Sequence, residues 1–292
     1  MLYKSNIENE NETNLPFLNS ITVLSNMKKI VKYNNEKFPD MSDLKGDFFS
    51  AINNLQGTNI PSKNDCILIE FENNELCEHL KKSKLFDEKA TSNNKHLFNE
   101  IEKNKIKYNI TTALKIIHSL EPNLYYLINQ LIGTIYCIKV KGSAGGSISN
   151  SIGLIWLNPS CDWSVIDYAD AIYHEFIHNS LFLDDMVNCI FPDPQLCEKN
   201  DAFVLSPIRK ERRPLDRSYH ASCVAIGLMH FYHLLSDDKN ARRFLEDLRQ
   251  TVTELNTKTS YLGKRGIEIL KAMNNFIEKQ DYENISKTLK IS

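Results

Sequence analysis

The feature that most constrains this fold is a long apolar stretch, residues 162–186, that also carries two histidines and a glutamate. It reads DWSVIDYADAIYHEFIHNSLFLDDM, and apolar side chains flank the polar ones on every side. A helix that is hydrophobic around its whole circumference is buried. Imidazoles and carboxylates inside such a helix cost free energy unless they have a partner. We therefore expect a core helix whose histidines share a bound partner.

The polar residues of this stretch form a His-Glu-x-x-His pattern at His174, Glu175 and His178. Residues four apart lie on one face of a helix, so both imidazoles can point at one ion. Glu175 is rotated from His174 by roughly 100° and lies beside that ion. The pattern is best known from zinc peptidases, in which the glutamate is the general base. The spacing thus predicts a metal site.

A third ligand is needed, and the known continuations of the pattern do not supply it. A metzincin would place Gly at 181 and His at 184, where this chain has Leu181 and Asp184. A gluzincin would place a glutamate on a second helix about twenty residues on. Glu198 stands at that distance, but in a segment broken by two prolines, which we expect to be a loop.

His220 is the better third ligand, because it opens a second predicted helix, residues 215–235. His230 and His233 point elsewhere on that helix, and we expect them to be packing or surface residues. The segment before His220 is strongly basic, with five cationic side chains within nine positions: Arg209, Lys210, Arg212, Arg213 and Arg217. Arginine binds carboxylates with two parallel hydrogen bonds. A fixed arginine beside a metal therefore suggests that a small anion also binds there.

The remaining segments are mostly helical in periodicity. We predict an α+β fold, predominantly α-helical with a small β-sheet, whose metal site lies between two helices and not in a cupin barrel. We expect a soft boundary near residue 105. The N-terminal region, 1–105, is mainly helical and a candidate for peptide binding, and residues 106–292 form the metal-binding catalytic domain. Expected helices cover 15–33, 41–55 with Ser42 as N-cap, 110–131 broken at Glu121–Pro122, 162–186, 215–235, 237–255 and 264–279. Expected strands lie in 133–140, 153–158 and 202–207, and residues 66–82 are ambiguous between strand-then-helix and a single helix.

Composition limits the classes of function. The 292 residues are 42% hydrophobic and 25% charged, with a net charge of −2, so nothing indicates a general nucleic-acid or membrane-surface binder. No run approaches the roughly 20 apolar residues of a membrane helix. Because the first residues are polar and acidic, we do not expect a secretory signal. Seven scattered cysteines, without a Cys-x-x-Cys pair, indicate a reducing cytoplasm. The sequence leaves the oligomeric state open.

Residues 110–235 resemble the HExxH-type 2-oxoglutarate-dependent peptide β-hydroxylases, which modify ribosomally made precursor peptides. The likeness lies in HSLEPNLYYLINQLIGTI, SISNSIGLIWLNP, DYADAIYHEFIHNSLFL and SPIRKERRPLDRSYHASCVAIGLMHFY. The last piece commonly reads Pro-Trp-Arg-x-Asp-Pro-Arg-Pro, followed by His-Ala or His-Gly. The positions that match are Pro207, Arg209, Arg213, Pro214, His220 and Ala221. Ile208 stands at the Trp position and Arg212 at the second Pro, which blurs the roles of the arginines.

The resemblance implies an Fe(II) oxygenase that uses 2-oxoglutarate and dioxygen to hydroxylate a side-chain β-carbon of a precursor peptide. It implies that His174, His178 and His220 hold Fe(II), since imidazole suits iron. An arginine would pair the distal carboxylate of 2-oxoglutarate, with Arg213 favoured and Arg209 second. Glu175 would then support the ligands by hydrogen bonding and need not be a base.

Three serines of the Gly/Ser segment 141–152 are further candidates. Ser147, Ser149 and Ser151 could line the cosubstrate or peptide cleft, or simply form a turn. Two other functions stay open at this point. A zinc metallopeptidase would use Glu175 as its general base and ignore 2-oxoglutarate, and a non-catalytic protein of the same fold would bind the peptide without product.

Overall fold

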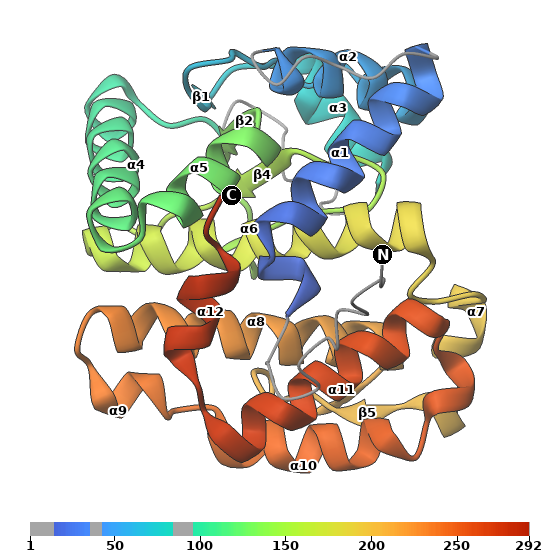
Figure 1. Ribbon diagram of the computed structural model, residues 1–292. Helices are drawn as coiled ribbons and strands as arrows, with labels where there is room; N and C mark the ends of the chain where they lie inside the picture. The colour runs from blue at the N-terminus through green and yellow to red at the C-terminus, as the bar shows by residue number, and fades with distance from the viewer. Residues whose placement is uncertain (1–14, 36–42, 84–95, 292) are drawn as a thin grey trace, which may run out of the picture.

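The fold is α+β and mainly helical, as the sequence predicts, and α6 forms its central helix (Figure 1). The computed structural model describes residues 15–35, 43–83 and 96–291. The helices are η1 (Pro16–Leu18), α1 (Ser20–Asn35), α2 (Leu44–Gln56), α3 (Asn74–Lys82), α4 (Glu100–Leu120), α5 (Pro122–Leu131), α6 (Val165–Asn188), α7 (Pro194–Cys197), η3 (Asn200–Ala202), α8 (Leu215–Leu234), α9 (Asp238–Ala241), α10 (Leu245–Asn256), η4 (Thr259–Tyr261), α11 (Lys264–Lys279) and α12 (Tyr282–Thr288).

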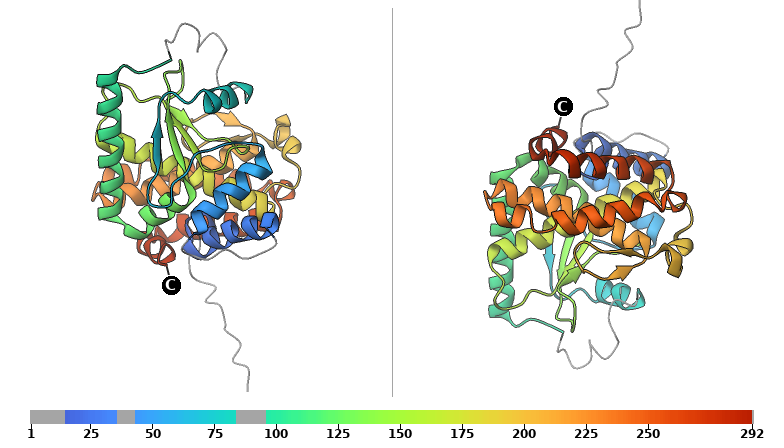
Figure 2. Two further views of the ribbon diagram at one scale, coloured as in Figure 1. Left: turned by 90° about the horizontal axis from the view of Figure 1, so that it is seen from above. Right: turned by 90° about the horizontal axis from the view of Figure 1, so that it is seen from below.

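Two small sheets complete the fold, and the described residues form no closed barrel. The strands are β1 (Leu68–Glu70), β2 (Thr134–Cys137), β3 (Gly145–Gly146), β4 (Leu154–Leu157), β5 (Val204–Leu205) and β6 (Arg212–Arg213). The first sheet has the order β1-β2-β4-β3, with β3 antiparallel to β4 and the other pairs parallel. β2 and β4 are buried along their whole length, which fits their continuous apolar sequences. Seen from above, α4 lies on one side of this sheet and α2 and α3 lie on the other (Figure 2).

The N-terminal elements pack into the same core as the rest of the chain. The ambiguous segment 66–82 is a strand followed by a helix, β1 and α3, and Asn73 caps α3 by accepting a hydrogen bond from the Leu76 amide. β1 pairs with β2, and α4 runs through residue 105, where the sequence suggests a boundary. Ser42, the expected N-cap of α2, lies outside the described residues, and α2 begins after Asp43.

The central helix α6 is held at its start by a capping box. The Ser164 side chain accepts from the Asp167 amide, and the Asp167 carboxylate accepts from the Ser164 amide. The helix ends at Cys189, which adopts a left-handed conformation. It packs against α1, α4, α5 and β4 on one side and against α8 on the other (Figure 1). The prediction of a buried helix over 162–186 is therefore confirmed.

α8 lies beside α6 because Gly227 permits a close approach. A Cβ at this position would clash with the Cδ1 methyl of Ile177 on α6, and it would meet Tyr173 Cζ at 3.5 Å. The start of α8 follows a hairpin, β5–β6, in which Ser206 donates its amide to the Glu211 carbonyl and Lys210 has a positive φ. The hairpin thus places the basic segment directly before the start of α8.

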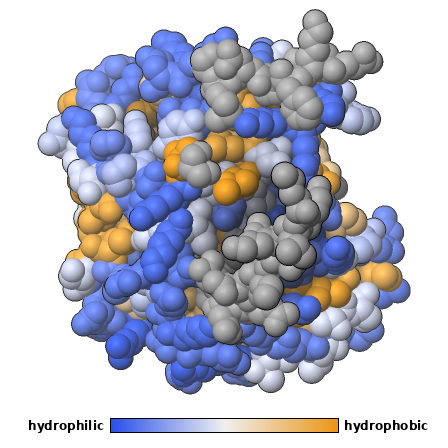
Figure 3. Space-filling model, in the orientation of Figure 1, coloured by the Kyte–Doolittle hydropathy of each residue, from blue (hydrophilic) through white to orange (hydrophobic). Residues whose placement is uncertain are grey.

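The C-terminal region departs from the expected pattern in two places. Residues 237–255, predicted as one helix, form α9 and α10 with a bend at Arg242–Phe244. The expected loop 191–201 contains the short helix α7, because Pro194 occupies the first helical position, where no amide is needed. The surface in the orientation of Figure 1 is mainly hydrophilic with a few apolar patches (Figure 3). Among the described residues, no helix combines the length and the apolar character needed to cross a bilayer.

Candidate metal centre

The two helices bring the three predicted histidines together. His178 Nδ1 on α6 lies 3.2 Å from His220 Nδ1 on α8, although 42 positions separate the residues. The ring centroids of His178 and His220 are 5.5 Å apart, and those of His174 and His178 are 5.1 Å apart. Phe182 and Phe191 pack their rings against His220. The pairing of α6 with α8 therefore creates a single imidazole cluster with aromatic walls.

Burial keeps these imidazoles neutral. It lowers the pKa of His220 to about 4. It also lowers the pKa of His178 well below its ordinary value, with further lowering by His174, His220 and Arg213. Burial also lowers the pKa of His174, and the neighbouring Glu175 partly offsets this shift. Neutral imidazoles have the free lone pairs that metal ions bind, so no proton must leave before binding at neutral pH.

The spacing of His178 and His220 fits a shared cation. Two nitrogens that each bind one ion at about 2.1 Å, at angles of roughly 90° to 110°, lie about 3.0 to 3.4 Å apart. The observed 3.2 Å falls within that interval. Across the described ranges, however, no three His, Cys, Asp or Glu side chains already converge on one point. A metal held by all three histidines would therefore require a side-chain rotation, and the side chain of His174, next to His178, is 29% exposed.

Glu175 has an unusual environment for a carboxylate. Its Oε1 lies 3.8 Å from His174 Nε2, and its Oε2 is buried with no hydrogen-bond partner among the described residues. Burial raises the pKa of Glu175, and His174 and the Ser147 hydroxyl oppose that rise. A buried acceptor without a donor costs about 1–3 kcal/mol. The carboxylate is therefore poised to accept a hydrogen bond from a ligand, a water or a rotated imidazole.

Asn179, which sequence reasoning missed, fixes the wall next to Glu175. Its Nδ2 donates to Ser147 Oγ at 2.9 Å and to the Glu175 carbonyl at 2.9 Å. Its Oδ1 accepts from the Gly153 amide at 2.7 Å. Asn179 stands four residues after Glu175, on the same helix face. This spacing is the one sequence signal that could have indicated its place beside the candidate site. The fully buried amide thus ties the Gly/Ser segment to α6.

The serines of that segment face different surroundings. Ser147 is the one that contacts α6, through Asn179 and the Glu175 carbonyl. Ser149 is exposed, and its carbonyl accepts from Gln56 Nε2. Ser151 is fully buried, and its hydroxyl forms a hydrogen bond with His79 on α3. The structure thus joins Ser147 to α6, while the Ser149 carbonyl is bonded to α2 and the Ser151 hydroxyl to α3.

Arg213 and Arg209 lie on the side of the hairpin near the histidines. Arg213 lowers the pKa of His178, and Arg209 and Arg243 lower that of His174. The Arg213 side chain is 31% exposed, and its ion pair with Glu211 is long, at 3.8 Å. Arg243, which no local pattern in the sequence marks, is held by Asp170 at 3.0 Å. Both arginines named from the sequence therefore act electrostatically on the predicted ligands.

The other candidates from the sequence have structural roles. Asp184 is buried and accepts from Arg265 Nε at 2.7 Å and from Asn26 Nδ2 at 2.8 Å. Glu198 caps the C-terminus of α7 on the surface. His230 is buried between Tyr173 and Ser286, and His233 stacks on Tyr282. The prediction that these two histidines are packing or surface residues is confirmed, since His230 is buried and His233 is exposed.

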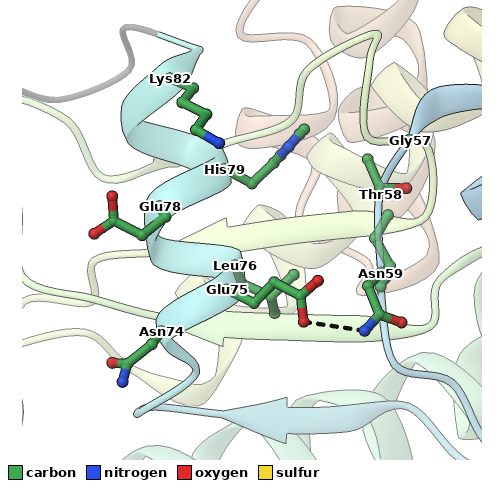
Figure 4. Close-up of a pocket in the computed structure, with 10 residues that line it drawn as sticks. Gly57, Thr58, Asn59, Asn74, Glu75, Leu76, Glu78, His79 and Lys82 are labelled. Carbon is green, nitrogen blue, oxygen red and sulfur yellow. Dashed lines mark hydrogen bonds between the residues drawn. The ribbon is translucent and has the colours of Figure 1, made fainter.

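A pocket of about 420 Å³ lies elsewhere, between α3 and residues 57–60 (Figure 4). Asn59 Nδ2 donates to Glu75 Oε2 across one side of it, and His79 and Lys82 border the other. His79 links this pocket to the Gly/Ser segment through Ser151. The pocket does not include any of the cluster histidines.

We compared the chain with protein-family models and with curated proteins. Neither protein-family models nor curated proteins give a match to this chain. The likeness to HExxH-type peptide β-hydroxylases therefore rests on the chain's own motifs.

Proposed function

We propose that this protein is an Fe(II)/2-oxoglutarate-dependent dioxygenase that hydroxylates a side-chain β-carbon of a ribosomally made precursor peptide. The observation that carries the proposal is the 3.2 Å approach of His178 Nδ1 and His220 Nδ1, with Arg213 acting on the same imidazole. A pair of neutral imidazoles at ligand spacing supports a metal. A cation next to it supports a carboxylate cosubstrate, which a zinc-bound water does not require.

In this proposal His174, His178 and His220 hold Fe(II). Bound Fe(II), with 2-oxoglutarate and dioxygen, supplies oxidative C–H hydroxylation, with succinate and carbon dioxide as coproducts. Arg213 pairs the distal carboxylate of 2-oxoglutarate and so orients the cosubstrate, and Arg209 is the second candidate for that role. The long ion pair of Arg213 with Glu211 leaves its guanidinium ready to exchange an exposed partner for the cosubstrate.

Glu175 and the aromatic residues shape the surroundings of the cluster. The unpartnered Oε2 of Glu175 accepts a hydrogen bond from an imidazole N–H or a bound water, which fixes that group's orientation. Phe182 and Phe191 cover His220 and exclude water from one side. Asn179 and Ser147 keep the facing wall in place. We place the reaction in a reducing cytoplasm, on the strength of the scattered cysteines.

A zinc metallopeptidase is the second candidate, and Glu175 is the observation that favours it. A buried carboxylate with a raised pKa, adjacent to a metal ligand, is what a general base for a metal-bound water needs. The arginines weigh against this function, because hydrolysis by a zinc-bound water does not need them, although some peptidases bind a substrate carboxylate.

The test compares metals and products on the full chain. Protein reconstituted anaerobically with Fe(II) is given 2-oxoglutarate and then oxygen, and succinate is measured. We expect succinate to form with Fe(II) and not with Zn(II). Cleavage of a casein substrate with Zn(II), without succinate from the Fe(II) sample, would establish the peptidase instead.

A further inference from the structure

The cationic residues of the hairpin fall into two groups with different partners. Lys210 Nζ pairs with Asp247 Oδ2 at 3.1 Å, and Arg212 pairs with Glu254 Oε2 at 3.1 Å. Both acids lie on α10. Successive side chains of a strand point to opposite faces, so Arg213 on β6 faces away from α10. One face of the hairpin thus has its charge neutralised within the protein.

The other group consists of Arg209, Arg213 and Arg217, and its charge is poorly matched. Arg213 reaches Glu211 at 3.8 Å, and Arg217 reaches Glu198 at 3.9 Å, both with exposed acids. Arg209 has no ion pair with a described residue, and its backbone amide is bonded to Ser206 Oγ. Burial and the two neighbouring arginines lower the pKa of Arg213, so the three cations lie close enough to repel each other. Arg217 also shares a helix face with His220, three positions on.

The proposed cosubstrate does not neutralise this group. Fe(II) carries two positive charges and 2-oxoglutarate two negative ones, so the pair adds no net charge. After Arg213 takes the cosubstrate carboxylate, Arg209 still has no ion pair with a described residue, and Arg217 keeps only its long pair with the exposed Glu198. Uncompensated cations beside a reaction site attract substrates of the opposite charge.

We infer that the peptide substrate is acidic, and that Arg209 and Arg217 bind Asp or Glu side chains that flank the modified residue. This inference rests on the proposed function, because it assigns Arg213 to the cosubstrate. The two carboxylates of the peptide would replace the weak pair with Glu198 and give Arg209 its partner. Residues 209–217 thereby set the charge of the substrate as well as the position of the cosubstrate.

The experiment uses the full chain and a fluorescein-labelled hexa-aspartate peptide, with binding followed by anisotropy. We expect hexa-aspartate to bind, hexa-lysine not to bind, and added NaCl to weaken the complex. Arg217→Gln should weaken binding roughly threefold to tenfold, and adding Arg209→Gln should weaken it further. Arg212→Gln is the matched control, since its partner is Glu254 on α10, and it should change the affinity less than twofold.

Three results would overturn the inference: no binding of hexa-aspartate, equal weakening by Arg212→Gln and Arg217→Gln, or tighter binding of an oligothymidylate of the same charge. The visible absorption of the Fe(II)–2-oxoglutarate complex is recorded on the wild type and on Arg217→Gln. If the peptide binds but that absorption is absent, Arg209 and Arg217 still bind an acidic peptide, and the oxygenase function is refuted. The absorption without peptide binding would refute the acidic substrate alone.

Discussion

His178 Nδ1 and His220 Nδ1 face each other at 3.2 Å across the contact between α6 and α8. At this distance two neutral imidazoles share a proton, and one acts as the donor. The same separation would suit two ligands of one ion, provided that the shared proton moves to the Nε2 atom of its ring, so that both Nδ1 lone pairs are free. In the proposed function, the contact between the helices would therefore be coupled to the occupancy of the site.

Replacement of His220 tests this coupling. We expect His220→Ala to weaken the binding of divalent metal by more than about a hundredfold, because a bidentate grip on α6 alone remains. Isothermal titration with Co(II) and Zn(II) measures the change. His233→Ala is the control, since His233 stacks on Tyr282 away from the cluster, and it should bind metal normally. Equal losses in both variants would mean that α8 has been disturbed as a whole.

Arg213→Gln separates cosubstrate binding from metal binding. A charged hydrogen bond is worth about 1.5–3 kcal/mol, so the concentration of 2-oxoglutarate needed for half-saturation should rise roughly tenfold to a hundredfold. The Fe(II) content after reconstitution should stay unchanged. Titration of 2-oxoglutarate into the reconstituted protein gives both values. If iron is lost as well, Arg213 supports the fold and does not bind the cosubstrate.

Gly227 can be tested by a double-mutant cycle with Ile177. A Cβ at residue 227 clashes with the Cδ1 methyl of Ile177, and Ile177→Val deletes that methyl. Overpacking costs about 1–3 kcal/mol, more than the roughly 0.5–1 kcal/mol that Ala gains over Gly in a helix. Gly227→Ala should therefore lower the free energy of unfolding in urea, and less so in the Ile177→Val background. Additive effects of the two substitutions would rule out this contact as the reason for the glycine.

The buried His230 should make the protein less stable in acid, independently of the imidazole cluster. Burial, with a contribution from His233, lowers its pKa to about 3, from an ordinary 6.5. Between these values the unfolded chain binds the proton and the folded protein does not, so stability is lost as the pH falls below about 6.5. At pH 5 the difference amounts to about 2 kcal/mol.

The measurement is urea unfolding at pH 7 and pH 5. His230→Gln should lose less stability between the two pH values than the wild type does, because glutamine takes up no proton. The exposed His118 on α4 serves as the comparison, and His118→Gln should follow the wild type. Parallel pH dependence in the wild type and His230→Gln would show that His230 does not contribute in this window.

Much of the architecture follows from local signals. Pro122 fixes the break between α4 and α5, the apolar run around His174 predicts α6, and the periodicity after Pro214 predicts α8. The bend between α9 and α10 was missed because residues 242–244 have no Gly or Pro to mark it. The strand and helix in residues 66–82 could not be separated either, since strand pairing of β1 with β2 joins segments more than sixty residues apart.

The candidate site likewise has features that local sequence predicts and features that depend on contacts between distant segments. The spacing of His174 and His178 within one helix could be predicted from periodicity alone. The partner of His178 depends on how α6 meets α8, and the partners of the arginines depend on where α10 lies. Side chains alternate between the two faces of a strand, which would have placed Arg212 and Arg213 on opposite faces of β6. The two-residue strand, however, was not recognisable in the sequence. Asn179 and Arg243 depend on contacts with distant segments in the same way.

The most direct test of the central claim is the absorption spectrum of the full chain under anaerobic conditions, with Fe(II) and 2-oxoglutarate added separately and together. We predict a weak charge-transfer band in the visible that requires both additions, persists in His233→Ala and disappears in His220→Ala. If metal analysis shows one iron per chain and the band is nevertheless absent in the wild type, the protein is not a 2-oxoglutarate-dependent oxygenase.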